Sequence, residues 1–75
     1  MKKNNNRVSI YKIIWFKIRY WQSIKGVTDD ELGAFMGVCD KTVRSYDIHC
    51  DGITLDKIDR FLAVNNMELN DLLNL

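Results

Sequence analysis

The side chains best suited to metal binding or nucleophilic chemistry lie close together in the chain. They are the two cysteines, Cys39 and Cys50, and the single histidine, His49. Thiolates and imidazole nitrogens are the usual ligands of zinc, so these three side chains could hold such an ion. A closed zinc site needs a fourth ligand and usually a second closely spaced pair, and the sequence supplies neither. We therefore expect two reduced thiols in a cytoplasmic protein, with no bound metal or cofactor.

The composition does not favour either of two broad classes of protein, enzymes and membrane proteins. The chain has one histidine, no glycine-rich phosphate loop, and no Ser-His-Asp or paired-carboxylate arrangement that a small helical domain would bring together. We interpret His49 as a surface residue and predict that the protein is not an enzyme and takes no small-molecule substrate. No apolar run approaches the roughly 20 residues that a membrane-spanning helix needs, so no membrane partner is expected.

Charge is distributed unevenly along the chain, although the net charge is only +1. Every Asp and Glu lies at or beyond Asp29. The first 25 residues contain no acid and seven cations, namely Lys2, Lys3, Arg7, Lys12, Lys17, Arg19 and Lys25. This asymmetry indicates either an acidic partner for the N-terminal end or a solvated basic face.

Helical periodicity predicts a first helix over residues 9–25. Its core-facing stripe holds four apolar residues within an arc of about 80°, namely Tyr11, Ile14, Ile18 and Trp21. Gly26 follows directly and suits the left-handed conformation with which many helices end. The residues before this helix have little apolar content, so we predict a flexible basic arm over residues 1–8 and a single domain over residues 9–75.

Start and stop signals predict a pair of short helices next. Thr28 and Glu31 fit a capping box, in which each side chain binds the backbone amide of the other residue. This helix is expected to end at Gly37, and a second one to begin at Cys39 or Asp40 and run to about Asp47.

The rest of the chain predicts a loop over residues 48–52 and two further helices. Thr54 is expected to cap the fourth helix, which should end at Asn65 and Asn66. The apolar face of this helix is Leu55, Ile58, Phe61 and Leu62. A short fifth helix carries Met67, Leu69, Leu72 and Leu73. No segment has the alternating pattern of a strand.

The segment VTDDELGAFMGVCDKTVRSY, residues 27–46, resembles the helix-turn-helix of the lambda-repressor-like (Cro/cI, Xre-type) family. The matching positions are Thr28, Glu31, Leu32, Met36, Gly37, Val38, Thr42 and Val43. Residues 53–73 resemble the two closing helices of that family, so the resemblance covers residues 14–73. It implies an all-α, five-helix lambda-repressor-like DNA-binding domain with a central helix-turn-helix. The implied protein is a small phage-type transcriptional regulator in a bacterial host cell.

Two single positions and one three-residue stretch depart from the family pattern. Gly33 stands where the family usually has Ala, and Gln22 where it usually has Arg. Residues 47–49, Asp-Ile-His, replace the usual Glu-Asn-Gly. Glycine at position 33 is expected to let the second helix of the motif approach closely, at a cost of up to about 1 kcal/mol in helix propensity.

The resemblance implies that the helix at residues 39–47 lies in the major groove of operator DNA. Carried over by position, the residues expected at the DNA are Asp40, Lys41, Arg44 and Ser45 at base edges, with Cys39 and Thr42 near the backbone. Lys41 or Arg44 could donate to guanine O6 and N7, and Asp40 could accept from cytosine N4. Asp40 could instead serve as the N-cap of this helix.

Acidic residues on the same face leave a second function open. Asp29, Asp40 and Asp51 would face or flank the duplex, where carboxylates repel phosphate. The alternative function is an anti-repressor or modulator, whose carboxylates imitate phosphate toward the basic face of a repressor. Such a protein would bind a repressor and not DNA.

A second apolar line on the first helix strengthens this alternative. Ile13, Phe16, Tyr20 and Ile24 lie roughly 130° from the core stripe at helical spacing. We interpret this line as a protein-binding face, for a second copy in a homodimer or for a repressor-type protein. Packing under the last helix would be the simpler explanation.

Overall fold

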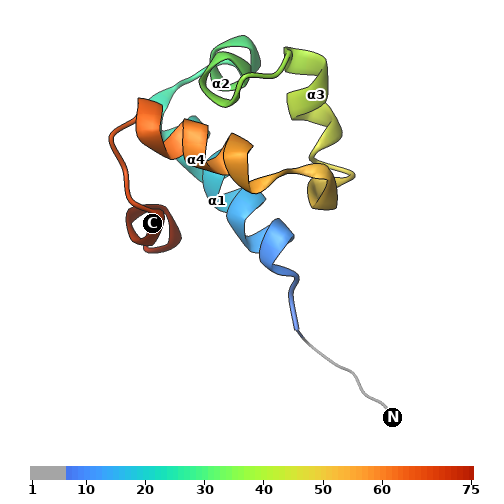
Figure 1. The fold of residues 1–75 in the computed structure, drawn as a ribbon, viewed down its shortest axis with the longest axis vertical. Coiled ribbons are helices and arrows are strands. Elements are labelled where there is room, and N and C mark those ends of the chain that lie inside the picture. Colours follow the sequence, from blue (N-terminus) through green and yellow to red (C-terminus); the bar gives the residue numbers. More distant parts are fainter. Residues whose placement is uncertain (1–6) are drawn as a thin grey trace.

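The computed structural model describes residues 7–75 and is all-helical over that range (Figure 1). It has five α-helices and one short 3-10 helix, Cys50–Gly52, between the third and the fourth. The α-helices are α1 (Ile10–Lys25), α2 (Asp29–Met36), α3 (Asp40–Ser45), α4 (Leu55–Val64) and α5 (Leu69–Leu73). The all-α prediction is therefore confirmed for the described residues. Most of the predicted arm, residues 1–6, lies outside them.

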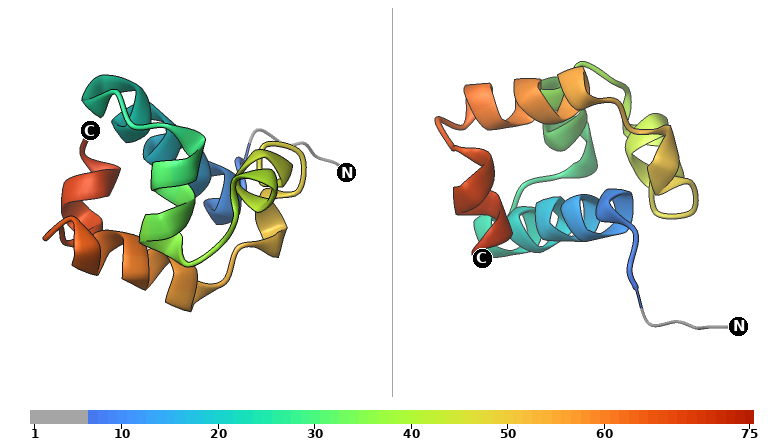
Figure 2. Two further views of the ribbon diagram at one scale, coloured as in Figure 1. Left: turned by 90° about the horizontal axis from the view of Figure 1, so that it is seen from above. Right: turned by 60° about the horizontal axis from the view of Figure 1, so that its bottom comes forward.

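The helices surround one core. In the right-hand view of Figure 2, α1 and α4 form opposite sides, α5 bridges them at one end, and α3 lies at the other. All five helices and the turns between them contribute to this core: Ile14, Trp15, Ile18, Trp21, Leu32, Met36, Val43, Tyr46, Ile53, Ile58, Phe61, Leu62 and Leu72. Trp21 makes an edge-on contact with Phe61 at 4.9 Å between ring centroids, and this contact ties α1 to α4.

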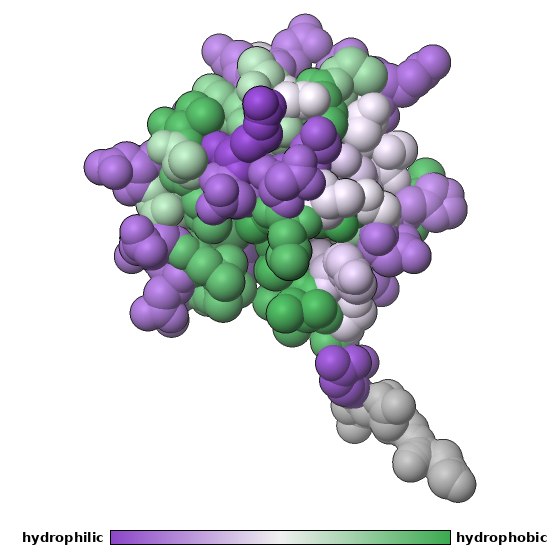
Figure 3. All heavy atoms as spheres, viewed as in Figure 1, coloured by the Kyte–Doolittle hydropathy of each residue, from purple (hydrophilic) through white to green (hydrophobic). Residues whose placement is uncertain are grey.

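Two residues predicted to face the core are exposed. Tyr11 is 44% and Leu55 81% accessible to solvent. Both line an open groove between the start of α1 and the start of α4, and apolar side chains reach the surface over these helices (Figure 3). Periodicity gives the direction of a side chain but not the place where two helices stop touching, so the prediction is wrong for these first turns.

The predicted ends of α1 and α2 are confirmed. Ser9 caps α1 by accepting from the Tyr11 amide, and Gly26 ends it with φ 67°. At the start of α2, Thr28 Oγ1 accepts from the Glu31 amide at 3.2 Å and Glu31 Oε1 accepts from the Thr28 amide at 2.9 Å. The first four backbone amides of a helix have no hydrogen-bond acceptor within it. The capping box supplies an acceptor for the Glu31 amide inside α2 and for the Thr28 amide just before it.

The caps of α3 and α4 differ from the prediction. Cys39 is the N-cap of α3 and Asp40 its first residue, so Asp40 is not the cap. The helix ends at Ser45, before the predicted Asp47, because the chain turns there. Thr54 holds the N-cap position of α4, but its hydroxyl donates to the Asp56 carboxylate instead of accepting from a backbone amide.

The corner between α2 and α3 depends on two glycines. Gly37 ends α2 with φ 80°, a conformation that side chains other than glycine rarely adopt. Gly33 lies directly under the chain that leads into α3: a Cβ atom there would lie 2.5 Å from the carbonyl oxygen of Val38. The expectation that glycine at position 33 permits a close approach is confirmed.

Candidate functional site

The outward face of α3 carries three of the residues predicted to contact DNA. Lys41, Arg44 and Ser45 are three and four residues apart, so they share one face of the helix. All three are exposed, whereas Val43, on the other side of α3, is completely buried. The Lys41 side chain makes no hydrogen bond or ion pair within residues 7–75. The core contact of Val43 therefore fixes the direction in which this face points.

The two hydroxyl residues of α3 are partly engaged within the helix. Ser45 Oγ donates to the carbonyl oxygen of Thr42 at 2.7 Å. The Thr42 hydroxyl lies 3.4 Å from the Cys39 thiol, and this hydrogen bond lowers the pKa of the thiol. Thr42 is half-buried. Ser45 keeps free lone pairs at the surface, but Thr42 is better placed to support the first turn of α3 than to reach outward.

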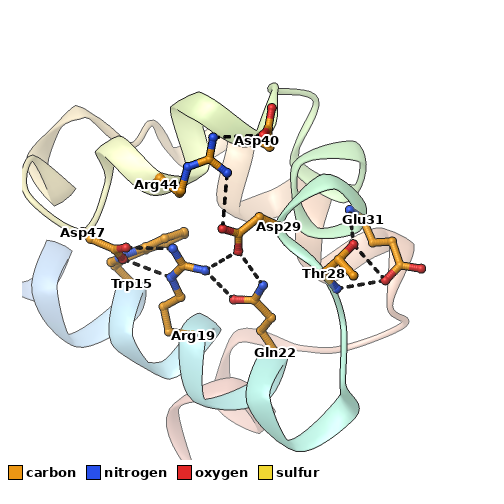
Figure 4. Close-up of polar contacts among 9 residues, drawn as sticks. All are labelled: Trp15, Arg19, Gln22, Thr28, Asp29, Glu31, Asp40, Arg44 and Asp47. Carbon is orange, nitrogen blue, oxygen red and sulfur yellow. Dashed lines mark hydrogen bonds and ion pairs between the residues drawn. The ribbon is translucent and has the colours of Figure 1, made fainter.

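Arg44 is held by two carboxylates from different helices. Its Nη2 lies 3.0 Å from Asp40 one turn earlier in α3, and its Nη1 lies 3.7 Å from Asp29 at the start of α2 (Figure 4). The Arg44 side chain is still 55% exposed. Arg44 therefore lies at the surface in a defined orientation, with its charge partly compensated.

A second guanidinium, on α1, ties the three N-terminal helices together beneath Arg44. Arg19 Nε and Nη2 donate to the two carboxylate oxygens of Asp47 at 3.0 and 2.8 Å, and Arg19 Nη1 donates to Asp29 at 2.6 Å (Figure 4). Gln22 accepts from Arg19 at 2.7 Å and donates to Asp29 at 2.8 Å. Trp15 Nε1 donates to Asp47 at 2.8 Å. We call these five side chains the α1 network.

The titration of these groups reflects the same contacts. Hydrogen bonds from Gln22 and Arg19 lower the pKa of Asp29. The hydrogen bond from Arg19 lowers the pKa of Asp47 and outweighs the opposing effect of partial burial. In return, the hydrogen bond to Asp47 raises the pKa of Arg19. All three groups are therefore charged at neutral pH, and each charge has an opposite partner.

The α1 network corrects one interpretation of the sequence. Asp29 was expected to face or flank the duplex and repel phosphate, but its carboxylate is bound by Arg19, Gln22 and Arg44. The signal for this arrangement was weak: Trp15, Arg19 and Gln22 recur on one side of α1 at helical spacing. Nothing local in the sequence indicates that Asp29 and Asp47 meet them there.

The predicted protein-binding line on α1 is open to solvent. Ile13, Phe16, Tyr20 and Ile24 are 42–56% exposed, so α5 does not cover them. The first three line a groove of about 550 Å³, whose other lining residues are Val8, Lys12, Lys17 and Leu75. The structure thus brings three of the four predicted residues together in one groove and places Ile24 beyond its lining.

Other kinds of site find no support in the described part of the chain. Between residues 7 and 75 no three His, Cys, Asp or Glu side chains are grouped so that they could hold a metal ion. None of the helices described there is long and apolar enough to cross a bilayer.

Comparisons of this chain with protein-family models, curated proteins and solved structures find no match. The two surfaces described above, the outward face of α3 and the groove on α1, are therefore interpreted from their own geometry and chemistry.

Proposed function

We propose that the protein is a helix-turn-helix transcriptional regulator of the lambda-repressor-like class, which binds double-stranded DNA through α3. In this proposal α2 and α3 are the two helices of the motif, joined at the corner that Gly33 and Gly37 make possible. Asp47, which stands where that family carries Glu, keeps a carboxylate in the turn that follows the second motif helix.

The observation that carries the proposal is the exposed cationic face of α3. Lys41 and Arg44 point away from buried Val43 on a helix narrow enough to enter the major groove. Either cation can donate to guanine O6 and N7, and such a contact discriminates against other bases by roughly 1–3 kcal/mol. Ser45 adds a hydroxyl that can serve either a base or a phosphate.

The α1 network supports the proposal by removing an electrostatic objection to it. Asp29 and Asp47 are engaged by Arg19 on the side of α3 that faces α1. These two carboxylates therefore repel an approaching phosphate less than their presence in the sequence suggests. The network also fixes the position of α3 relative to α1, and a fixed helix loses less entropy when it binds.

A salt titration on random-sequence duplex DNA tests the proposal. We expect affinity at low salt that falls steeply toward physiological salt, because phosphate contacts release counterions. Lys41→Ala should weaken binding, whereas Lys17→Ala, which removes the same charge from the side of α1 opposite Arg19, should leave it nearly unchanged. Absence of binding at low salt, or equal losses in the two variants, would overturn the proposal.

A protein-binding modulator is the second candidate, and the charge of the α2–α3 region favours it. Residues 27–52 carry six carboxylates against two cations, and Asp30, Glu31 and Asp51 are exposed. Such a surface could imitate phosphate toward the basic face of a repressor. This candidate gains support if the salt titration shows no DNA binding at all.

A further inference from the structure

The outer face of α1 has the residue spacing of a helix-pairing seam. Ile13, Phe16 and Tyr20 follow one another at intervals of three and four residues, the spacing of a and d positions in a coiled coil. All three are about half exposed and line one groove. With Ile24 the line extends over about 16 Å, or three helical turns. An occupant that matches this surface is a helix of similar length that lies along α1.

The flanking charges indicate the chemistry of that helix. If Ile13 is an a position, Lys12 and Lys17 occupy the neighbouring g and e positions, where charged residues select the partner of a coiled coil. Both lysines line the groove. Within residues 7–75 no carboxylate side chain pairs with either lysine, and Lys17 Nζ donates to the backbone carbonyl of Leu75 at 2.7 Å. We propose that the groove on α1 binds an amphipathic helix of another protein, with acidic residues beside its apolar stripe.

A second copy of this chain does not fit the same groove. If two α1 helices paired in parallel, Lys12 would face Lys17 of the other copy, and in an antiparallel pair each lysine would face its counterpart. Like charges in these positions oppose association. The acidic surfaces of a second copy lie at residues 29–31 and beyond. They would reach the groove only head to tail, in a heterologous contact that builds a ring or an open filament and not a two-fold dimer.

The groove can be occupied independently of α3. At helical spacing, the apolar line of Ile13, Phe16, Tyr20 and Ile24 lies on average about 140° around α1 from Trp15, Arg19 and Gln22, which hold α3 through Asp47 and Asp29, and Lys12 lies between the two faces. A partner on this face therefore leaves Lys41 and Arg44 open. The inference does not rest on DNA binding, and the two can fail separately.

Two designed helical peptides test the proposal. Both carry leucine at a and d positions; one has glutamate and the other lysine at e and g. Fluorescence anisotropy should show that the glutamate peptide binds at least about tenfold more tightly than the lysine peptide, with the preference reduced by added salt. Phe16→Glu should abolish binding, while Leu55→Glu, which changes an exposed apolar residue on another face, should not. Circular dichroism checks that each variant stays folded.

Reversing the charge of the two lysines tests directly whether they select the peptide. The double variant Lys12→Glu, Lys17→Glu should prefer the lysine peptide over the glutamate peptide. Three results would overturn the proposal: no binding of the glutamate peptide, equal binding of both peptides, or an unchanged preference in the double variant. Sedimentation of the wild type as a dimer that Phe16→Glu disperses would also overturn it, because the face would then bind a second copy.

Discussion

Arg44 is proposed to contact DNA, but within the protein it already pairs with the carboxylate of Asp40. Asp40 lies 3.0 Å from the Arg44 guanidinium and is itself half-buried on α3. This carboxylate holds Arg44 in place, but it also neutralises part of the charge and would repel a nearby phosphate. A single substitution of Asp40 can therefore measure the net effect of this carboxylate on the affinity for DNA.

Asp40→Asn should strengthen binding to random duplex DNA by about fivefold, since one repulsive charge near the phosphates is worth on the order of 1 kcal/mol. Asp59→Asn makes the same change in charge at an exposed position of α4 and should have a much smaller effect. Anisotropy titrations at one low salt concentration compare the two variants. Weaker binding by Asp40→Asn would mean that Asp40 contacts the DNA or orients Arg44 in a way that binding requires.

Arg19 makes the stability of the protein depend on pH. The pKa values of Asp29 and Asp47 are lowered in the folded state. Hydrogen bonds from Gln22 and Arg19 are the chief cause for Asp29, and the hydrogen bond from Arg19 is the chief cause for Asp47. A carboxylate whose pKa is lowered by folding stabilises the folded protein at pH values above its unfolded-state pKa of about 3.9. This stabilisation is lost as the pH falls through the folded-state pKa.

Arg19→Met should therefore destabilise the protein at pH 7 by about 1–2 kcal/mol, a modest value because the network is partly open to solvent. The loss should shrink as pH falls below about 4, because protonated carboxylates no longer need the guanidinium. Urea unfolding of wild type and variant at several pH values measures it. A loss that stays constant down to pH 2 would show that Arg19 acts through packing alone.

Among the elements, α2 and the corner that follows it were the most predictable from sequence. The capping box of Thr28 and Glu31 and the final Gly37 are local signals, and each has the predicted role. The contacts of α1 were less predictable. Trp15 is completely buried and bonds to Asp47, 32 residues away, so no local pattern could reveal its partner.

The predicted site shows the same division between local and distant contacts. The shared face of Lys41, Arg44 and Ser45 follows from helical spacing and a buried Val43, both readable in the sequence. The compensation of Asp29 does not, because its partners come from α1 and α3. Sequence spacing places a side chain on its own helix, whereas its charge environment depends on how the helices pack.

The corner between α2 and α3 allows a test at the level of elements. Gly33→Ala should destabilise the protein by about 1–3 kcal/mol, although alanine favours helix, because its Cβ would clash with the Val38 carbonyl. Gly52→Ala is the matched control: its Cβ would meet nothing within 4 Å, so stability should change by less than about 0.5 kcal/mol. Thermal unfolding compares the two. A stabilised Gly33→Ala variant would contradict the close approach of these helices.

On the scale of the whole molecule, charge and exposed apolar surface divide between two faces. The groove on α1 is apolar and flanked by lysines, while α3 presents a mixed polar face held by the α1 network. α1 contributes to both faces, since Arg19 and Ile13 lie about 120° apart around one helix. The two proposals together assign DNA to the face of α3 and an acidic helix of another protein to the groove on α1.

The central claim is that α3 is the surface that meets DNA. Heteronuclear NMR of the labelled protein, titrated with a random-sequence duplex at low salt, tests it most directly. We predict that amide shifts concentrate in α3 and the first turn of α2, fade as salt is raised, and spare Ile13, Phe16 and Tyr20. Shifts confined to the groove on α1, or no shifts at any salt concentration, would contradict the claim.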